Sequence, residues 1–189
     1  MSNISLICDN IVARLTDLGS PIAALLMPGA TLPEIAEVEQ SLGISLPDSA
    51  REMYLWRNGT KLEQGACLFP WWTFDSLEES HQRYQVLVRD PISWSRSLFP
   101  LFSSSDISSI GILCGNLPVQ DAQIECYEHS LGRSLEYENI ASMLNTILSA
   151  LEAGVITVTA TGDLDYDKVE FARIAQKLNP DVAKWCTES

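Results

Sequence analysis

Basic residues are scarce in this sequence. The 189 residues include 12 Lys and Arg against 25 Asp and Glu, so the formal net charge at pH 7 is −13. A field of this sign repels the phosphate backbone, because proteins hold nucleic acids by neutralising phosphates with Lys and Arg. It also repels an anionic membrane surface. The charge therefore argues against nucleic acid and membrane as partners and favours a basic protein, although acidity can also serve solubility alone.

Histidine is nearly absent, which limits the catalytic chemistry that the chain offers. The two histidines, His81 and His129, lie far apart in unrelated segments. We interpret His81 as a solvated residue on a helix and His129 as a turn residue at the end of a strand. The sequence has neither a Gly-x-Ser-x-Gly elbow nor a phosphate-cradling glycine loop. We expect no catalytic residues, and only a Ser-His-Asp site assembled by folding stays open, because such triads are recognised by geometry.

Metal-binding and disulfide patterns are also missing. Asp163, Asp165 and Asp167 alternate as in a calcium loop, but Lys168 and Ile174 stand where an EF-hand needs Gly and Glu. We expect neither metal nor cofactor and interpret these acids as a helix start. The five cysteines are odd in number and lack the close spacing of a zinc or redox site, so we expect free thiols, mostly buried, in a reducing compartment. They are Cys8, Cys67, Cys114, Cys126 and Cys186.

Long hydrophobic runs are the last absence. No apolar run approaches the ~20 residues that span a bilayer, and the N-terminus lacks the basic and apolar regions of a secretory signal. These features, with the free thiols, indicate a cytoplasmic protein. The apolar share of 46% and the five Trp, five Tyr and five Phe predict one well-packed domain over residues 1–189.

Helix signals dominate the first third of the chain. Thr31 and Glu34 form a capping box, Pro33 suits the first turn, and Gly43 ends the helix that they begin. A second short helix starts after Leu46-Pro47 and ends at the turn dipeptide Asn58-Gly59. The predicted segments of this part are a helix over 4–18, a connection over 21–29, and helices over 31–43 and 46–58.

Short segments rich in β-formers follow and predict an antiparallel sheet. Ser76 and Glu79 form another capping box, and Asn139 caps an amphipathic helix that ends at Gly154. The serine run 103–106 is interpreted as a loop. The predicted strands are 67–69, 99–102, 110–114, 124–128 and 134–137, and the predicted helices are 76–88 and 139–154. A tail adds a strand at 155–159 and a helix at 165–178, and it either completes the domain or packs on its outside.

An aromatic pair is the strongest candidate for a binding surface. Adjacent residues of a strand point to opposite faces, so Trp71 and Trp72 divide into one that packs in the core and one that is partly exposed. Exposed Trp is enriched at the hot spots of protein interfaces. Asp75, Glu78 and Glu79 follow directly and are expected to give the patch an acidic rim. These five residues are the predicted contacts with a basic partner, alongside the alternative that both Trp residues are core.

The stretch 31–59 resembles the opening of the SUKH superfamily, which includes fungal cell-wall assembly regulators and bacterial immunity proteins. The resemblance is carried by Leu32-Pro33-Glu34-Ile35, Glu39, Leu42-Gly43, Leu46-Pro47 and Asn58-Gly59. Segments 99–102 and 110–113 resemble the paired strands of the family, although Cys114-Gly115 stand where the family often has an acidic residue. Residues 139–154 resemble its closing helix. The SUKH-like core thus covers 31–154, and the N-terminal helix and the 155–189 extension lie outside it.

The resemblance implies an α+β fold, with helices packed on an antiparallel sheet, and a non-enzymatic role. Bacterial relatives are immunity proteins that neutralise a cognate toxin, often a nuclease, and the compactness and acidity of this chain favour that type. We therefore expect a protein partner, a basic toxin domain. The alternatives are a regulatory scaffold of the cell-wall (beta-glucan) synthesis type and an unrecognised hydrolase. The sequence leaves the oligomeric state open.

Overall fold

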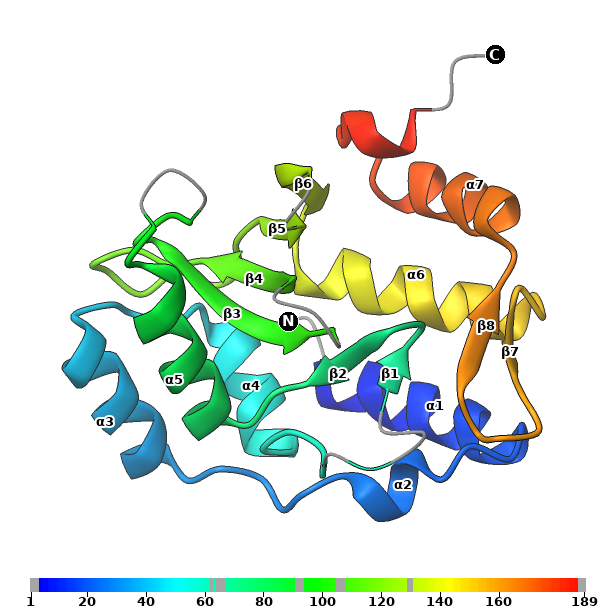
Figure 1. Ribbon diagram of the computed structural model, residues 1–189, viewed down its shortest axis with the longest axis horizontal. Coiled ribbons are helices and arrows are strands. Elements are labelled where there is room, and N and C mark those ends of the chain that lie inside the picture. The colour runs from blue at the N-terminus through cyan, green and yellow to red at the C-terminus, as the bar shows by residue number, and fades with distance from the viewer. Residues whose placement is uncertain are drawn as a thin grey trace.

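The computed structural model describes residues 4–61, 63, 67–90, 94–104, 108–128 and 131–186 (Figure 1). The helices are α1 (Ile4–Asp17), α2 (Ile22–Leu25), α3 (Leu32–Leu42), α4 (Asp48–Trp56), α5 (Leu77–Leu87), α6 (Ile140–Glu152), α7 (Lys168–Leu178) and the short 3-10 helix η1 (Ala183–Trp185). The strands are β1 (Cys67–Phe69), β2 (Trp72–Phe74), β3 (Leu98–Ser103), β4 (Ser109–Leu113), β5 (Ile124–Glu128), β6 (Gly132–Tyr137), β7 (Ile156–Val158) and β8 (Leu164–Tyr166).

Strands β1 to β6 form one antiparallel sheet in which each strand pairs with the next one along the chain. Ile110 of β4, for example, lies between Phe102 of β3 and Cys126 of β5. Consecutive strands are thus neighbours throughout the sheet, and the connection between β2 and β3 contains α5. Strands β7 and β8 form a separate hairpin. The predicted α+β architecture, with helices on an antiparallel sheet, is confirmed.

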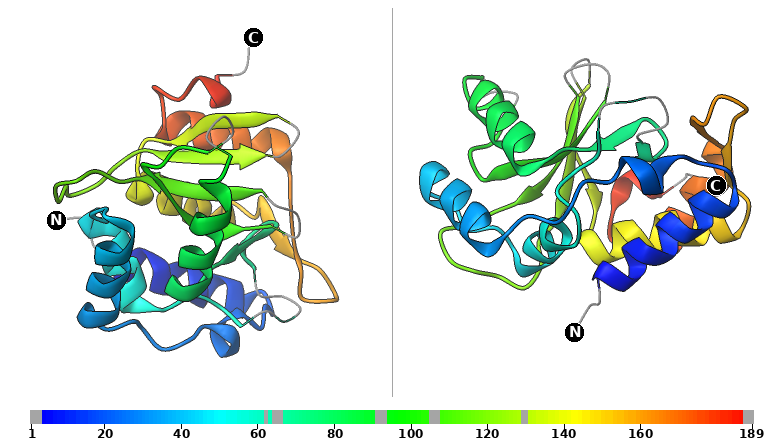
Figure 2. Two further views of the ribbon diagram at one scale, coloured as in Figure 1. Left: turned by 60° about the vertical axis from the view of Figure 1, so that its left-hand side comes forward. Right: turned by 90° about the horizontal axis from the view of Figure 1, so that it is seen from below.

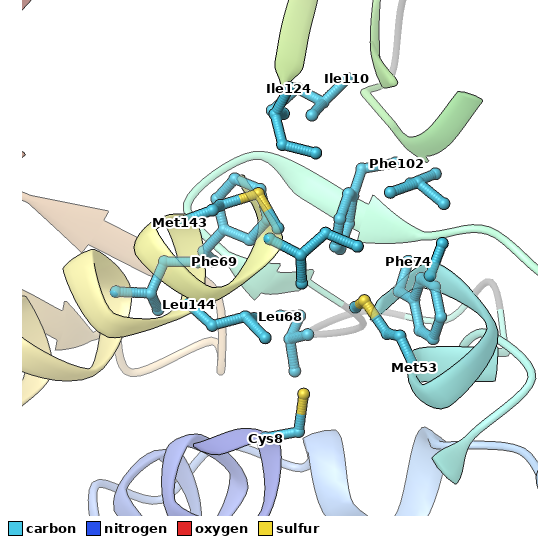
Figure 3. Close-up of a cluster of buried hydrophobic side chains, with 14 of the residues drawn as sticks. Cys8, Met53, Leu68, Phe69, Phe74, Phe102, Ile110, Ile124, Met143 and Leu144 are labelled. Atoms are coloured by element: carbon cyan, nitrogen blue, oxygen red, sulfur yellow. The ribbon is translucent and has the colours of Figure 1, made fainter. Parts of the chain in front are cut away.

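The helices cover both sides of the sheet. Figure 2 shows α3 and α5 on one side, and α1 and α6 side by side on the other. The main core lies between the sheet and the helices α1, α4 and α6, where Cys8, Phe69, Phe102, Met143 and Leu144 meet (Figure 3). These side chains are almost fully buried, and burial of each large apolar one stabilises the fold by about 1.5–3 kcal/mol.

The predicted helix caps are confirmed. Thr31 Oγ1 accepts a hydrogen bond from the backbone of Glu34, whose carboxylate accepts one in return from the backbone of Thr31. The same reciprocal pair joins Ser76 and Glu79 at the start of α5. Asn139 caps α6, with Ser142 as its partner. Local hydrogen-bonding chemistry therefore sets where these helices begin.

Three local predictions need correction. The last helix begins at Lys168, not at residue 165, because Leu164–Tyr166 pair with Ile156–Val158 as a hairpin and Asp167 then caps the helix. A short helix, α2, lies within the expected connection 21–29, and the strand expected to contain both tryptophans begins only at Trp72 and extends to Phe74 as β2. Elements of three or four residues depend on their tertiary partners, so a pattern within the sequence predicts them poorly.

The C-terminal extension, residues 155–186, completes the core. Ile156, Leu164, Phe171 and Ala175 are buried in the same apolar cluster as the sheet. Asn179, fully buried, donates to Thr146 of α6 and accepts from the backbone of residue 138. Of the two placements that the sequence left open, the structure selects the one that completes the domain.

Free thiols are confirmed at all five cysteines, of which Cys8, Cys114 and Cys126 are buried, Cys67 is half-buried and Cys186 is exposed. Burial raises the pKa of the Cys114 thiol to about 12, so it stays protonated at neutral pH. Within the described ranges, no helix has the length and apolar character needed to cross a membrane.

The motif residues that carry the family resemblance hold the scaffold together. Glu39 Oε1 accepts hydrogen bonds from the backbone N–H of Leu46 at 2.7 Å and from Arg51 Nη2 at 2.7 Å, which fixes the Leu-Pro turn between α3 and α4. Asn58 Oδ1 accepts from the backbone N–H of Leu77 at 2.8 Å and so satisfies the first turn of α5. The motif thus joins segments that lie far apart in the sequence.

Gly59 provides a direct test of this scaffold role. Its φ is +83°, and a Cβ there would lie 2.4 Å from the backbone N of Ser76. We expect Gly59→Ala to lower the free energy of unfolding by more than about 2 kcal/mol, measured by urea denaturation. Gly43→Ala is the matched control, because its φ is +65° but nothing lies within 4 Å of the added Cβ. We expect Gly43→Ala to lower the free energy of unfolding by only about 1 kcal/mol, which is the cost of a non-glycine residue in the left-handed region. Equal losses in the two variants would contradict the close approach.

Candidate functional site

A groove of about 340 Å³ lies between the sheet and the C-terminal extension. One wall comes from the β1–β2 turn and from β5 and β6, and the other from β8, α7 and η1. Figure 1 shows the β1–β2 turn beside β8, which agrees with a ring contact between residues of these two segments. The side chains that give the groove its chemistry are Trp71, Glu128, Glu136, Tyr166, Lys168 and Trp185.

Trp71 occupies an unusual backbone position at the rim of the groove. It follows Pro70 in the turn between β1 and β2 and has a φ of +71°, as at the third residue of a type II turn, where Gly or Asn is usual. No other described non-glycine residue has a positive φ. The ring contacts Tyr166, yet the residue is 55% exposed. Strain of this kind is concentrated at functional sites, which makes Trp71 a candidate contact.

Trp72 is half-buried in β2, where its ring lies 6.4 Å from that of Phe69. The pair is therefore divided into an exposed and a more buried residue, which is one of the two alternatives that the sequence left open. The physical reason differs from the expected alternation along a strand, since Trp71 lies in the turn before β2. Sequence signals at this turn were limited to Pro70.

A continuous chain of aromatic rings ties the β1–β2 turn to the extension. The ring centroids of Trp71 and Tyr166 lie 5.5 Å apart, and those of Tyr166 and Phe171 lie 5.3 Å apart. Phe171 then contacts Trp185 at 5.9 Å, and Trp185 contacts Tyr137 of β6 at 5.7 Å. Pairs at these separations each contribute about 0.5–1.5 kcal/mol beyond their buried area. Of these rings, those of Trp71, Tyr166, Phe171 and Trp185 line the groove, and Tyr137 joins them to β6.

Two lysines lie over this lining in different settings. Lys184 Nζ is 5.3 Å from the Trp185 ring centroid and donates to both carboxylate oxygens of Glu136 at 2.7 Å. Lys168 Nζ is 5.1 Å from the Trp71 ring centroid and forms no ion pair with a described residue. Lys184 is thus held by an ion pair with Glu136, whereas Lys168 is held by the Trp71 ring.

Two carboxylates line the groove. Glu136 is buried, and burial raises its pKa, an effect that Lys184 partly offsets. Glu128 is half-buried at the end of β5, and it makes no ion pair within the described part of the chain. Alternation along β5 places Glu128 on the same face as the buried Ile124 and Cys126. The sheet face that forms the core therefore ends in a carboxylate at the groove.

The first acid of the predicted rim is buried. Trp71 lies in the turn before β2 and Trp72 begins the strand, whereas Asp75, Glu78 and Glu79 follow its far end. Asp75 is 2% exposed and accepts hydrogen bonds from Ser103 Oγ at 2.5 Å and Arg83 Nε at 3.1 Å. The expectation that Asp75 contributes to an exposed rim is wrong, because the chain turns inward there.

Glu79 is half-buried and serves the α5 cap, while Glu78 is exposed and accepts from Gln82. These two acids remain predicted contacts of a surface separate from the groove. Sequence reasoning missed Glu128, Tyr166, Lys168 and Trp185. The alternation of residues 124, 126 and 128 could have indicated Glu128, whereas nothing local marks the other three, since only folding brings them beside Trp71.

The remaining candidates for catalytic chemistry are few. His81 is partly buried between α5 and α3, where its Nε2 contacts Ser41 Oγ at 3.2 Å and the Gln85 amide at 3.0 Å. His129 and residues 105–106 of the serine run lie outside the described residues. Across the described ranges, no group of three or more His, Cys, Asp or Glu has a geometry that would hold a metal ion. A second groove, of about 370 Å³, is lined by Tyr84, Arg96 and Cys114 among others.

Comparison with known proteins gives one family match. The family model described as the SMI1 / KNR4 family (SUKH-1) matches residues 29–149. No curated protein matches the sequence. The matched segment includes Trp71, Glu128 and Glu136, whereas Lys168 and Trp185 lie beyond it. The groove is therefore built jointly by the family domain and by the C-terminal extension of this chain.

The pKa of Asp75 provides a test of the ion pair that this buried carboxylate makes with Arg83. Burial raises the pKa of its carboxyl from 3.8 to about 6, despite the opposing effects of Ser103 and Arg83. We expect carbon-13 NMR of the Asp75 carboxyl to show a midpoint near pH 6, and Arg83→Leu to move it higher. The native state then holds the proton more tightly than the unfolded chain. The resulting stability is fully present below about pH 4 and is lost as the pH rises through 6. A midpoint below 4 would contradict the burial effect.

Proposed function

The chain belongs to the SMI1 / KNR4 family (SUKH-1), and from this premise we propose that it is a non-enzymatic protein-binding module, an immunity protein that neutralises a basic, nuclease-type toxin. The resemblance of the motif in residues 31–59 to bacterial immunity proteins supports the assignment. The free thiols are consistent with a protein that binds its partner in a reducing cytoplasm.

The observation that carries the proposal is an exposed tryptophan on a strongly acidic molecule. Trp71 lies in a strained turn and is exposed, and Trp residues are enriched among the hot spots that dominate the binding energy of many interfaces. The formal charge of −13 would accelerate the encounter with a basic surface. Nucleases carry such a surface where they hold the phosphate backbone. An inhibitor that covers it needs the opposite charge and an apolar anchor, and this chain has both.

The two alternatives differ in what they require. A hydrolase needs an activated nucleophile, and the candidate pair Ser41–His81 has no carboxylate partner for its imidazole among the described residues. Substrate screening with Ser41→Ala would reveal such an activity. A scaffold linked to beta-glucan synthesis would use the same surface for a different protein. Partner proteomics separates it, since kinases or synthases would be recovered in place of toxins.

The proposal predicts that Trp71 anchors the toxin. We expect the product of the neighbouring open reading frame to be toxic when expressed alone, and harmless when co-expressed with this protein. Trp71→Ala should weaken the complex by about 10- to 100-fold in calorimetric titration, as loss of a hot spot does. Leu131→Ala is the control, because Leu131 is 78% exposed and does not line the groove.

Salt dependence gives a second readout of the same complex. Association should slow as ionic strength rises, because opposite charges steer the encounter. A neighbouring product without toxicity, together with no complex between the two proteins, would overturn the assignment. An equal loss of affinity in Trp71→Ala and Leu131→Ala would instead remove Trp71 from the interface.

A further inference from the structure

We propose that the Trp71 face of the groove is a receptor for one basic side chain, an arginine or a lysine of the toxin, and that Lys168 occupies this receptor until the partner displaces it. The inference rests on the proposed function, since it names the chemistry by which that partner would be recognised. It also makes the C-terminal extension part of the binding site.

The ring of Trp71 already accepts a cation. Lys168 Nζ lies 5.1 Å from its centroid, within the ~6 Å at which a cation is attracted to an aromatic face. Tyr166 contacts the same indole in a T-shaped arrangement and so holds it in place. The native geometry therefore presents the arrangement that a partner's ammonium or guanidinium would adopt.

The groove also supplies a carboxylate for an incoming cation. Glu128 lines the same groove as Trp71 and is half-buried, yet it makes no ion pair with a described residue. The other groove carboxylate, Glu136, is already bound to Lys184 through both oxygens. Charge complementarity thus favours a cation at Glu128, and a guanidinium suits it best because Arg both stacks on rings and bonds carboxylates.

Lys168 is suited to leave when a stronger cation arrives. It is the first residue of α7, where the positive end of the helix dipole disfavours a cation. Its side chain is exposed and has no carboxylate partner among the described residues. Lys184 is exposed too, but it differs in its partner, because the buried carboxylate of Glu136 accepts two hydrogen bonds from it. The two lysines over tryptophans are therefore an exchangeable occupant and a fixed structural contact.

The test uses the full-length protein and the probe N-acetyl-arginine methylamide. Binding is followed by NMR at the indole N–H of Trp71, which is assigned with Trp71→Phe. We expect Lys168→Gln to bind the probe about two- to fivefold more tightly than the wild type, the range that loss of a competing exposed cation–π contact allows. Trp71→Leu, which lacks the reporting indole, should abolish probe binding in calorimetric titration, and Glu128→Gln should weaken binding by either measurement. The citrulline analogue, which lacks the charge, should not bind.

Lys177→Gln is the matched control for net charge. Lys177 lies in the last turn of the same helix, is exposed and does not line the groove. It removes one positive charge, as Lys168→Gln does, without emptying the Trp71 face. Equal gains in the two variants would overturn the proposal, because they would reflect net charge alone. A probe response that does not involve the Trp71 indole would overturn it as well.

The failure of this inference can be told apart from failure of the proposed function. The probe titration needs no toxin, so probe binding at Trp71 without any toxin complex would leave the receptor standing and sink the immunity role. A toxin complex whose affinity is the same in Lys168→Gln and Lys177→Gln, together with no probe binding, would support the immunity role and reject the receptor.

Discussion

The C-terminal half of the candidate site depends on one buried group, the carboxylate of Glu136. An ionised group in this position must be paired, because burial without a partner costs several kcal/mol. Lys184 supplies the charge through two hydrogen bonds, and the indole N–H of Trp185 donates to the backbone carbonyl of Glu136 at 2.6 Å. Both partners come from η1, at the far end of the extension. A folded sheet therefore keeps η1 docked, and with it the second wall of the groove.

The family motif and the groove have different roles: the motif residues stabilise the fold, and the groove residues are the candidate contacts with a partner. Glu39, Asn58 and Gly59 make hydrogen bonds or close backbone approaches that fix how the first helices meet the sheet. None of the three lines the groove. A resemblance carried by such residues therefore indicates the architecture, whereas the proposed partner contacts are other side chains, such as Trp71 and Lys168. Binding specificity can change at the groove without any cost to the scaffold, since the two sets of contacts do not overlap.

The extent to which the sequence predicted the structure follows from the same division. Capping boxes such as Thr31–Glu34 use neighbours in the chain, so the starts of α3 and α5 could be read directly. Strand β2 and the hairpin that contains Tyr166 depend on their pairing partners, and their local sequence patterns did not predict where β2 begins or that β8 forms. For the predicted contacts, the structure bears on exposure alone. Trp71 is exposed, in agreement with one of the two alternatives, whereas Asp75 is buried, because a residue's neighbours in the sequence do not fix its burial.

An intramolecular cation on the receptor has a consequence for selectivity. A cation–π contact contributes about 0.5–1 kcal/mol at an exposed site and about 2 kcal/mol when water is excluded. Lys168 makes the exposed kind, so a free basic residue that replaces it gains almost nothing. A protein that covers the groove while its arginine enters excludes water from the cation–π contact. It therefore gains the difference between the exposed and the desolvated contact energies. On this proposal the occupied Trp71 face binds isolated cations, which abound in a cell, only weakly, and it binds more tightly a basic side chain presented on a surface that fits around it.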